Sequence, residues 1–241
     1  MERFFFIHIQ KTAGTSLRQH LMENFERSEV YPPPQEGGLY NYLVIYQMGA
    51  YLVDLPATEQ ARFRLFHGHM PFAVTQRLAL DKPPTTFTVL REPVARTLSV
   101  LKQKKKMRPE LAEASLEDIY DNRKYFEGQI LNHQAKIFAV PDDSDLLAGF
   151  DPYPVGPDDL ARAKANLEKV DVIGLQSDMP AFLGELERRF GWKTLTEDVR
   201  ENVSSETEVS PSLLDRITAD NAVDIEFYRH AEKLVRARAG S

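Results

Sequence analysis

The sequence contains no cysteine, only one tryptophan and no apolar run long enough to cross a membrane. Without cysteine the chain forms no disulfide bonds, has no thiolate nucleophile and offers no sulfur ligands of that kind to a metal. It also lacks an excess of positive charge, because its formal net charge is −6 at neutral pH. A general attraction to nucleic acid or to an anionic membrane is therefore excluded, and an anionic ligand would need local basic residues.

The composition that remains is that of an ordinary globular chain. Hydrophobic residues make up 42% and charged residues 27% of the 241 positions. A chain of this length can bury one sizeable α/β core, so we predict a single domain over residues 1–241. No charged leader precedes the first apolar segment, and we therefore expect a cytoplasmic protein. Nothing in the sequence specifies its oligomeric state.

The most informative stretch is residues 4–17, which read FFFIHIQKTAGTSL. The apolar, aromatic and β-branched run at its start predicts a strand buried on both faces, as in a parallel sheet. Leu17, Leu21 and Phe25 then recur every four residues, which predicts a helix after a turn of small residues. The first N–H groups of a helix have no partners within it, so the N–H groups of residues 13–17 are expected to face a phosphate-like anion.

The position of the lysine in this turn indicates which kind of anion it binds. A nucleotide P-loop has its lysine after the last glycine, whereas Lys11 comes before Gly14. The turn resembles the 5′-phosphosulfate loop of sulfotransferases that use 3′-phosphoadenosine 5′-phosphosulfate (PAPS), which has the pattern H-I/V-P/Q-K-T-A/G-G-T-S/T. The resemblance extends to Gln10, because the heparan sulfate 6-O-sulfotransferases carry glutamine at this position. An ordinary helix N-terminus capped by Thr and Ser is the alternative. The resemblance implies that PAPS contacts come from Lys11, Thr12, Ala13, Gly14, Thr15, Ser16 and Leu17.

A second strand is predicted from residue 64 to Gly68, with His67 and His69 on either side of that glycine. If the extended conformation continues through Gly68, both rings project on the same side. The H-G-H-x-P-F segment resembles the catalytic-base segment of the heparan sulfate 2-O-sulfotransferase, which implies that a histidine takes the proton of an acceptor hydroxyl. We favour His69, perhaps assisted by His67, because it lies nearer the carboxyl edge of the strand. A structural histidine pair and a metal site are the alternatives, and we expect no metal.

The third informative segment is a β-branched strand at residues 85–90 that runs into Arg91, Glu92 and Pro93. A helix is predicted from Pro93, since proline suits the first helical turn. The pattern R-E/D-P-x-x-R-x-x-S resembles the 3′-phosphate-binding segment of PAPS sulfotransferases. It implies that Arg91 and Ser99 bind the 3′-phosphate, while Arg96 either assists or is structural.

Three further groups of residues are weaker candidates. Asn202 and Ser204 fall where relatives place a loop that closes over the nucleotide, although a plain surface loop fits equally well. Asn132 and Gln134 match an Asn-x-Gln pair of relatives, to which spacing assigns no role. The basic cluster is either a solvated helix end or a docking patch for an anionic acceptor; it comprises Lys102, Lys104, Lys105, Lys106 and Arg108.

The remaining elements are predicted from apolar periodicity and from Pro and Gly positions. Residues 39–55 are either a helix or an irregular segment, and residues 142–159 are predicted as a loop. A strand is expected at 170–175. Helices are expected at 57–64, 115–121, 124–140, 160–167, 180–190 and 220–237.

The resemblance implies a P-loop-like, three-layer α/β fold with a central parallel sheet flanked by helices. The implied activity is transfer of the sulfuryl group of PAPS to an acceptor hydroxyl, which leaves 3′-phosphoadenosine 5′-phosphate (PAP) as the second product. A histidine would act as the base, and Lys11 would stabilise the departing phosphate. The acceptor is expected to be a glycan or another small molecule, with no nucleic acid partner. A P-loop kinase-like phosphotransferase and a non-catalytic nucleotide- or glycan-binding module are the alternatives.

Overall fold

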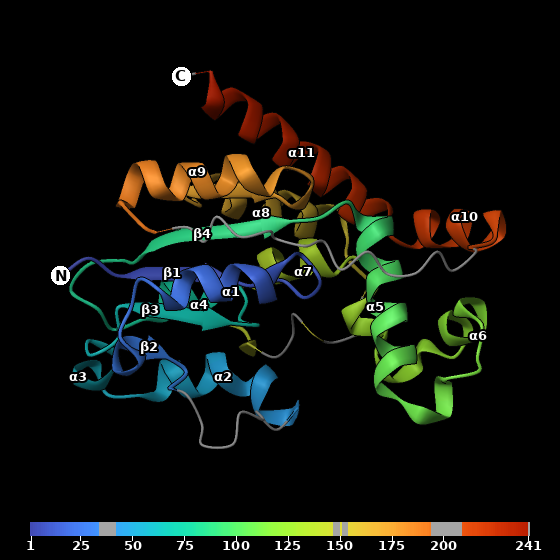
Figure 1. The fold of residues 1–241 in the computed structure, drawn as a ribbon, viewed down its shortest axis with the longest axis horizontal. Coiled ribbons are helices and arrows are strands. Elements are labelled where there is room, and N and C mark those ends of the chain that lie inside the picture. The colour runs from blue at the N-terminus through green and yellow to red at the C-terminus, as the bar shows by residue number, and fades with distance from the viewer. Residues whose placement is uncertain (34–41, 147–149, 151–153, 194–208, 241) are drawn as a thin grey trace.

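The centre of the molecule is a five-stranded, all-parallel sheet with the strand order β2-β3-β1-β4-β5 (Figure 1). The computed structural model describes residues 1–33, 42–146, 150, 154–193 and 209–240. Helices cover the sheet, so the predicted α/β fold with a central parallel sheet flanked by helices is confirmed. The strands are β1 (Phe4–Ile7), β2 (Val30–Tyr31), β3 (Leu65–Gly68), β4 (Thr85–Leu90) and β5 (Val172–Leu175).

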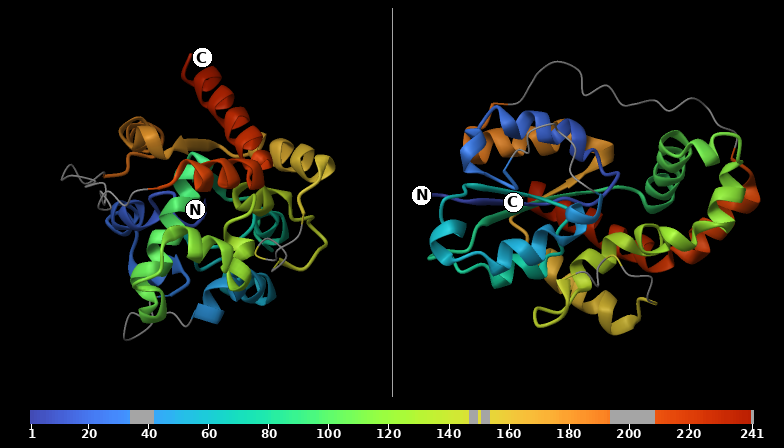
Figure 2. Two further views of the ribbon diagram at one scale, coloured as in Figure 1. Left: turned by 90° about the vertical axis from the view of Figure 1, so that its right-hand side faces the viewer. Right: turned by 90° about the horizontal axis from the view of Figure 1, so that it is seen from below.

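The central strand β1 is buried on both faces, as its unbroken apolar run predicts. Alternate side chains enter different cores, because successive residues of a strand point to opposite faces. Phe4 and Phe6 belong to a core with side chains of α1 (Gly14–Met22) and α9 (Met179–Phe190). Figure 2 shows these two helices together on one side of the sheet.

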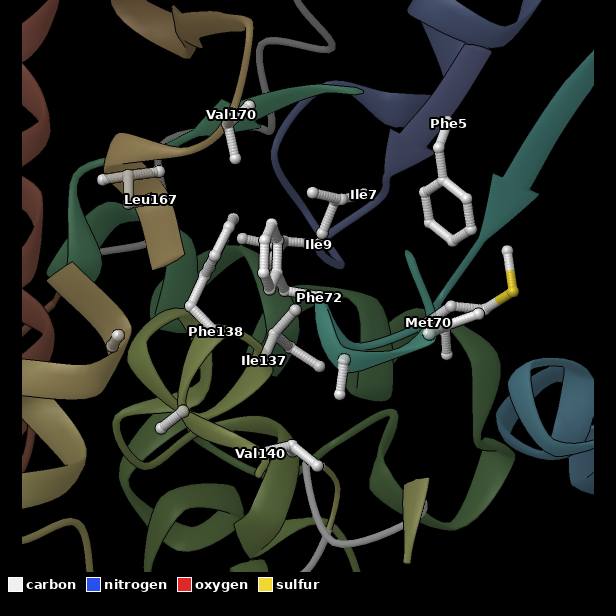
Figure 3. Close-up of a cluster of buried hydrophobic side chains, with 14 of the residues drawn as sticks. Phe5, Ile7, Ile9, Met70, Phe72, Ile137, Phe138, Val140, Leu167 and Val170 are labelled. Carbon is white, nitrogen blue, oxygen red and sulfur yellow. The ribbon is translucent and has the colours of Figure 1, made fainter. Parts of the chain in front are cut away.

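The other alternate residues of β1, Phe5 and Ile7, enter a larger core on the opposite face. Figure 3 shows Ile7 and Ile9 directed toward Phe72 and Phe138 in this core. The helices that contribute to it are α2 (Tyr42–Asp54), α4 (Ala73–Arg77), α7 (His133–Ala139), α8 (Pro157–Glu168) and α11 (Ala222–Ala239).

A third group of helices packs beyond the carboxyl ends of the strands, on the right in Figure 1. Val100 and Leu101 contact Leu116, Ile119 and their neighbours in a core separate from those of the sheet. These helices frame the edge of the sheet at which ligands of open α/β folds bind. They are α5 (Pro93–Met107), α6 (Leu116–Asp121) and α10 (Pro211–Asp220).

Most predicted elements are confirmed within a few residues, and the undecided segment 39–55 is helical from Tyr42. The predicted helix at 124–140 is confirmed only over α7, because 3₁₀ turns precede α7 and Asn132 adopts a left-handed backbone with φ 46°. The predicted loop at 142–159 is wrong at its end, since α8 already begins at Pro157. Strand β2 and helix α10 were not predicted. The short elements are α3 (Ala57–Gln60) and the 3₁₀ turns Arg27–Glu29, Pro109–Leu111, Arg123–Tyr125, Glu127–Gln129 and Gln176–Asp178.

In the described part of the chain, none of the helices combines the length and the apolar character that a membrane crossing requires.

Candidate functional site

Three sequence motifs meet at the carboxyl edge of the sheet because of the register of its strands. Ile7 at the end of β1 pairs with Gly68 at the end of β3, and on its other side with Thr88 of β4. The turn after β1 therefore lies between His69, which follows β3, and Arg91, which follows β4. This is the edge at which parallel α/β sheets bind their ligands.

The turn between β1 and α1 has an uncommon backbone. Lys11 and Ala13 have φ angles of 66° and 69°, in a left-handed region that residues other than glycine seldom adopt. Left-handed Ala13 is followed directly by the right-handed α1, a backbone combination that in other proteins forms concave anion sites from successive N–H groups. The Thr12 side chain is fully buried, and its hydroxyl donates to the Ile9 main-chain oxygen over 2.9 Å. This hydrogen bond from the Thr12 hydroxyl therefore stabilises the turn.

The N–H groups that α1 can offer to an anion are those of residues 13–16. The N–H of Leu17 donates to the Ala13 oxygen over 3.1 Å, which closes the first hydrogen bond of the helix. The expectation that the Leu17 N–H faces the anion is therefore wrong. Gly14, Thr15 and Ser16 form the first turn of α1, as predicted.

His8 is a site residue that the sequence interpretation missed. Its ring stacks on Phe6, with centroids 5.0 Å apart, and lies against His69, with centroids 4.4 Å apart. A Cβ atom on Gly14 would lie 1.6 Å from His8 Nε2, so the imidazole occupies the space that any other residue at position 14 would need. The alternation of side chains along the strand could have predicted this position, because Phe6 and His8 lie on the same side of β1, the side that faces α1.

The hydrogen bonding of His69 fixes which of its nitrogens can accept a proton. Nδ1 lies 2.9 Å from the main-chain oxygen of His8. A carbonyl oxygen only accepts, so Nδ1 carries the hydrogen and Nε2 carries the free lone pair of the neutral ring. Burial lowers the pKa of His69, and this hydrogen bond opposes the shift. The neutral ring is thus in the tautomer that a general base at Nε2 requires.

His67 lies deeper in β3, where it pairs with Phe6, and burial together with the charge of Arg18 lowers its pKa to about 3. At pH 7 the His67 ring is therefore uncharged, and it is a weak proton acceptor. The extended backbone continues through Gly68, the last residue of β3, and no further. Gly68 has φ 154°, and the Met70 N–H donates back to its oxygen over 2.9 Å, so the chain turns at His69.

The two predicted anion-binding motifs contact each other directly. Arg91 Nη1 donates to the Lys11 main-chain oxygen over 3.3 Å. Burial and the nearby charges of Arg91 and Lys106 lower the pKa of Lys11. Lys11 in the turn after β1 thus has the cations Arg91 and Lys106 near it, and this positive potential favours an anionic ligand there. Ser99 lies half-buried on the second turn of α5.

Arg96 is structural rather than a ligand-binding residue. Its side chain is fully buried, and it donates from Nη1 to the Gln10 oxygen over 3.1 Å and from Nη2 to the Gln129 oxygen. Burial lowers its pKa to about 10, so it stays charged at neutral pH. Of the two roles left open by the sequence, the contacts therefore support the structural one.

The basic cluster of α5 does not lie wholly on the surface. Lys104 is only 4% exposed and lies over the ring of Phe126, while Lys105 Nζ donates to the Ala114 oxygen over 2.7 Å. Lys106 is exposed and close enough to Lys11 to affect its pKa. Asn202 and Ser204 lie outside the described residues. Over the described ranges, no three His, Asp or Glu side chains converge in a way that could hold a metal ion.

Comparison with known proteins adds no family to these observations. The chain matches none of the protein-family models and none of the curated protein sequences against which it was compared.

Proposed function

We propose that this protein is a sulfotransferase that moves the sulfuryl group of PAPS to an acceptor hydroxyl. The contact between Arg91 Nη1 and the Lys11 oxygen carries the proposal, because it joins the segment that resembles a 5′-phosphosulfate loop to the segment that resembles a 3′-phosphate site. A ligand with phosphates at both ends of one nucleoside fits two such segments at neighbouring strand ends. The anion-directed backbone of Ala13 and Gly14 supports the same assignment.

In the proposed reaction His69 Nε2 accepts the proton of the acceptor hydroxyl. The acceptor oxygen forms a bond to sulfur as the bond from sulfur to the 5′-phosphate oxygen breaks, and that phosphate oxygen keeps the electron pair. The products are the sulfated acceptor and PAP. Lys11 and the N–H groups of residues 13–16 stabilise the negative charge that grows on the departing phosphate. We propose a glycan or another small hydroxyl compound as the acceptor.

The choice of His69 over His67 rests on hydrogen bonding and burial. The bond from His69 Nδ1 to the His8 oxygen orients the ring and supports its protonated form after proton transfer. Among the described residues the His67 ring has no comparable hydrogen bond, and its pKa of about 3 makes it the weaker base.

Calorimetry with PAP and AMP tests the nucleotide assignment, since the two ligands differ only in the 3′-phosphate. We expect PAP to bind at least about tenfold more tightly, in line with charge-assisted contacts to the added phosphate. Equal affinities, or binding of Mg²⁺–ATP in preference to PAP, would refute the proposal. An acceptor library with ³⁵S-labelled PAPS then tests turnover, and absence of transfer to every hydroxyl compound would favour a non-catalytic binding module.

A further inference from the structure

Gln134 makes two hydrogen bonds to the main chain of Arg91 from a fully buried position on α7. Its Oε1 accepts from the Arg91 N–H over 3.0 Å, and its Nε2 donates to the Arg91 oxygen over 2.8 Å. The amide thus satisfies both polar groups of the backbone directly after β4, as a neighbouring strand would. The residues are 43 positions apart in sequence, so the contact exists only in the folded chain.

Gln134 is itself held by the C-terminal helix α11. Asp224 Oδ2 accepts from the Gln134 N–H over 3.1 Å, and Oδ1 accepts from the Ala135 N–H over 2.7 Å. Asn132, at the start of α7, donates its N–H to the Asn221 side chain over 2.9 Å. The beginning of α7 is therefore fixed against α11, and the Gln134 amide has little freedom to leave Arg91.

We propose that Gln134 is a positioning residue that sets the affinity for the 3′-phosphate by fixing the backbone from which the Arg91 guanidinium projects. The inference rests on the proposed function, because it takes Arg91 as the 3′-phosphate contact. Without Gln134, the Arg91 N–H and oxygen lose their partners and the backbone at this position shifts or opens to water. A displaced guanidinium loses its aligned, charge-assisted bonds to phosphate.

Replacing Gln134 by Met removes both hydrogen bonds while keeping the length of the side chain. We expect PAP to bind at least about tenfold more weakly to Gln134→Met, because small displacements of a positioning contact have large effects. Binding of AMP, which has no 3′-phosphate, is expected to stay within about twofold. A change confined to PAP separates positioning of Arg91 from a general loss of structure.

Gln60 provides a matched control, since it is equally buried and also bonds the main chain. Its Nε2 donates to the Leu55 oxygen over 2.9 Å, and its Oε1 accepts from the Ala79 N–H over 2.8 Å. Gln60→Met therefore makes the same chemical change outside the site. Its ratio of PAP to AMP affinity is expected to equal that of the wild type.

The outcomes separate the inference from the proposed function. A wild-type protein that does not prefer PAP over AMP overturns both. A wild-type preference that persists unchanged in folded Gln134→Met overturns only the role of Gln134. If Gln134→Met does not fold, Gln134→Glu replaces it, because a carboxylate of the same shape still accepts from the Arg91 N–H but cannot donate to the Arg91 oxygen. A PAP-to-AMP ratio within about twofold of wild type in Gln134→Glu would then overturn the inference.

Discussion

The imidazole ring of His69 lies 4.4 Å from that of His8, centroid to centroid, while its Nδ1 donates to the main-chain oxygen of the same residue. One residue thus provides both a packing surface and a hydrogen-bond acceptor for the proposed base. His8 also lies against Gly14 at the start of α1. The proposed base and the turn that begins α1 are therefore both in contact with the His8 side chain.

Removal of the proposed base is expected to reduce turnover without loss of nucleotide binding. We predict that His69→Ala lowers kcat by about 10²- to 10⁴-fold, the usual contribution of a general base. The PAP affinity should stay within about twofold of wild type, because the cations of the nucleotide site remain. Transfer from labelled PAPS and calorimetry with PAP measure the two quantities. Unchanged turnover with a good acceptor would show that His69 is not the base.

The close approach of Gly14 to His8 predicts a strong coupling between these positions. Gly14→Ala is expected to lower the free energy of unfolding by about 1–3 kcal/mol, because the new Cβ must displace the His8 ring. In a His8→Ala background the same change should be neutral or slightly stabilising, since alanine favours the helix over glycine.

Urea denaturation of the four proteins in this double-mutant cycle measures the coupling. If Gly14→Ala costs the same free energy in both backgrounds, the ring does not occupy the space above Gly14.

The burial of His67 predicts a dependence of stability on pH. Its pKa falls from about 6.5 in the unfolded chain to about 3 in the folded one, so the unfolded state binds the proton first as the pH is lowered. The contribution of neutral His67 to the free energy of unfolding is therefore fully present above pH 6.5 and is lost progressively as the pH falls toward 3. Between pH 7 and pH 5 the loss amounts to about 2 kcal/mol.

His67→Phe removes this titration while keeping an aromatic ring in β3. Its free energy of unfolding should therefore fall less than that of wild type between pH 7 and pH 5, as measured by urea denaturation at each pH. Parallel pH profiles for the two proteins would mean that His67 titrates normally in the folded state.

The lysines of α5 are expected to separate into a stabilising and a binding group. Lys104→Ala should lower the free energy of unfolding by about 1–2 kcal/mol, because its buried stem and its contact with Phe126 are lost. Lys106→Ala should leave stability unchanged and raise the KM for an acidic acceptor by about two- to fivefold at low salt.

Steady-state kinetics with an acidic and a neutral acceptor, at two salt concentrations, distinguish these effects. An equal KM for the acidic acceptor in wild type and Lys106→Ala would exclude a role of Lys106 in acceptor binding.

Local sequence signals were sufficient for the elements that form the frame of the site. The apolar run of β1, the turn of small residues before α1 and the proline that begins α5 each act within a few residues of their own position. They predicted where strands end and helices start, and hence the parallel sheet with two basic segments at one edge. They also led to the choice of His69, which remains a prediction together with the nucleotide and the reaction.

The sequence by itself thus determined four of the five described strands, the order of the motifs and the kinds of residue at the edge of the sheet. Only the tertiary structure decided which groups are already engaged: Leu17 within its helix, Arg96 beneath the turn, His8 against Gly14, and Gln134 on the backbone of Arg91. Two of these contacts, Arg96 with Gln10 and Gln134 with Arg91, join residues 86 and 43 positions apart, and neither produces a periodic pattern. They depend on the positions of whole helices, which are set by the packing of the two cores rather than by any local run of residues.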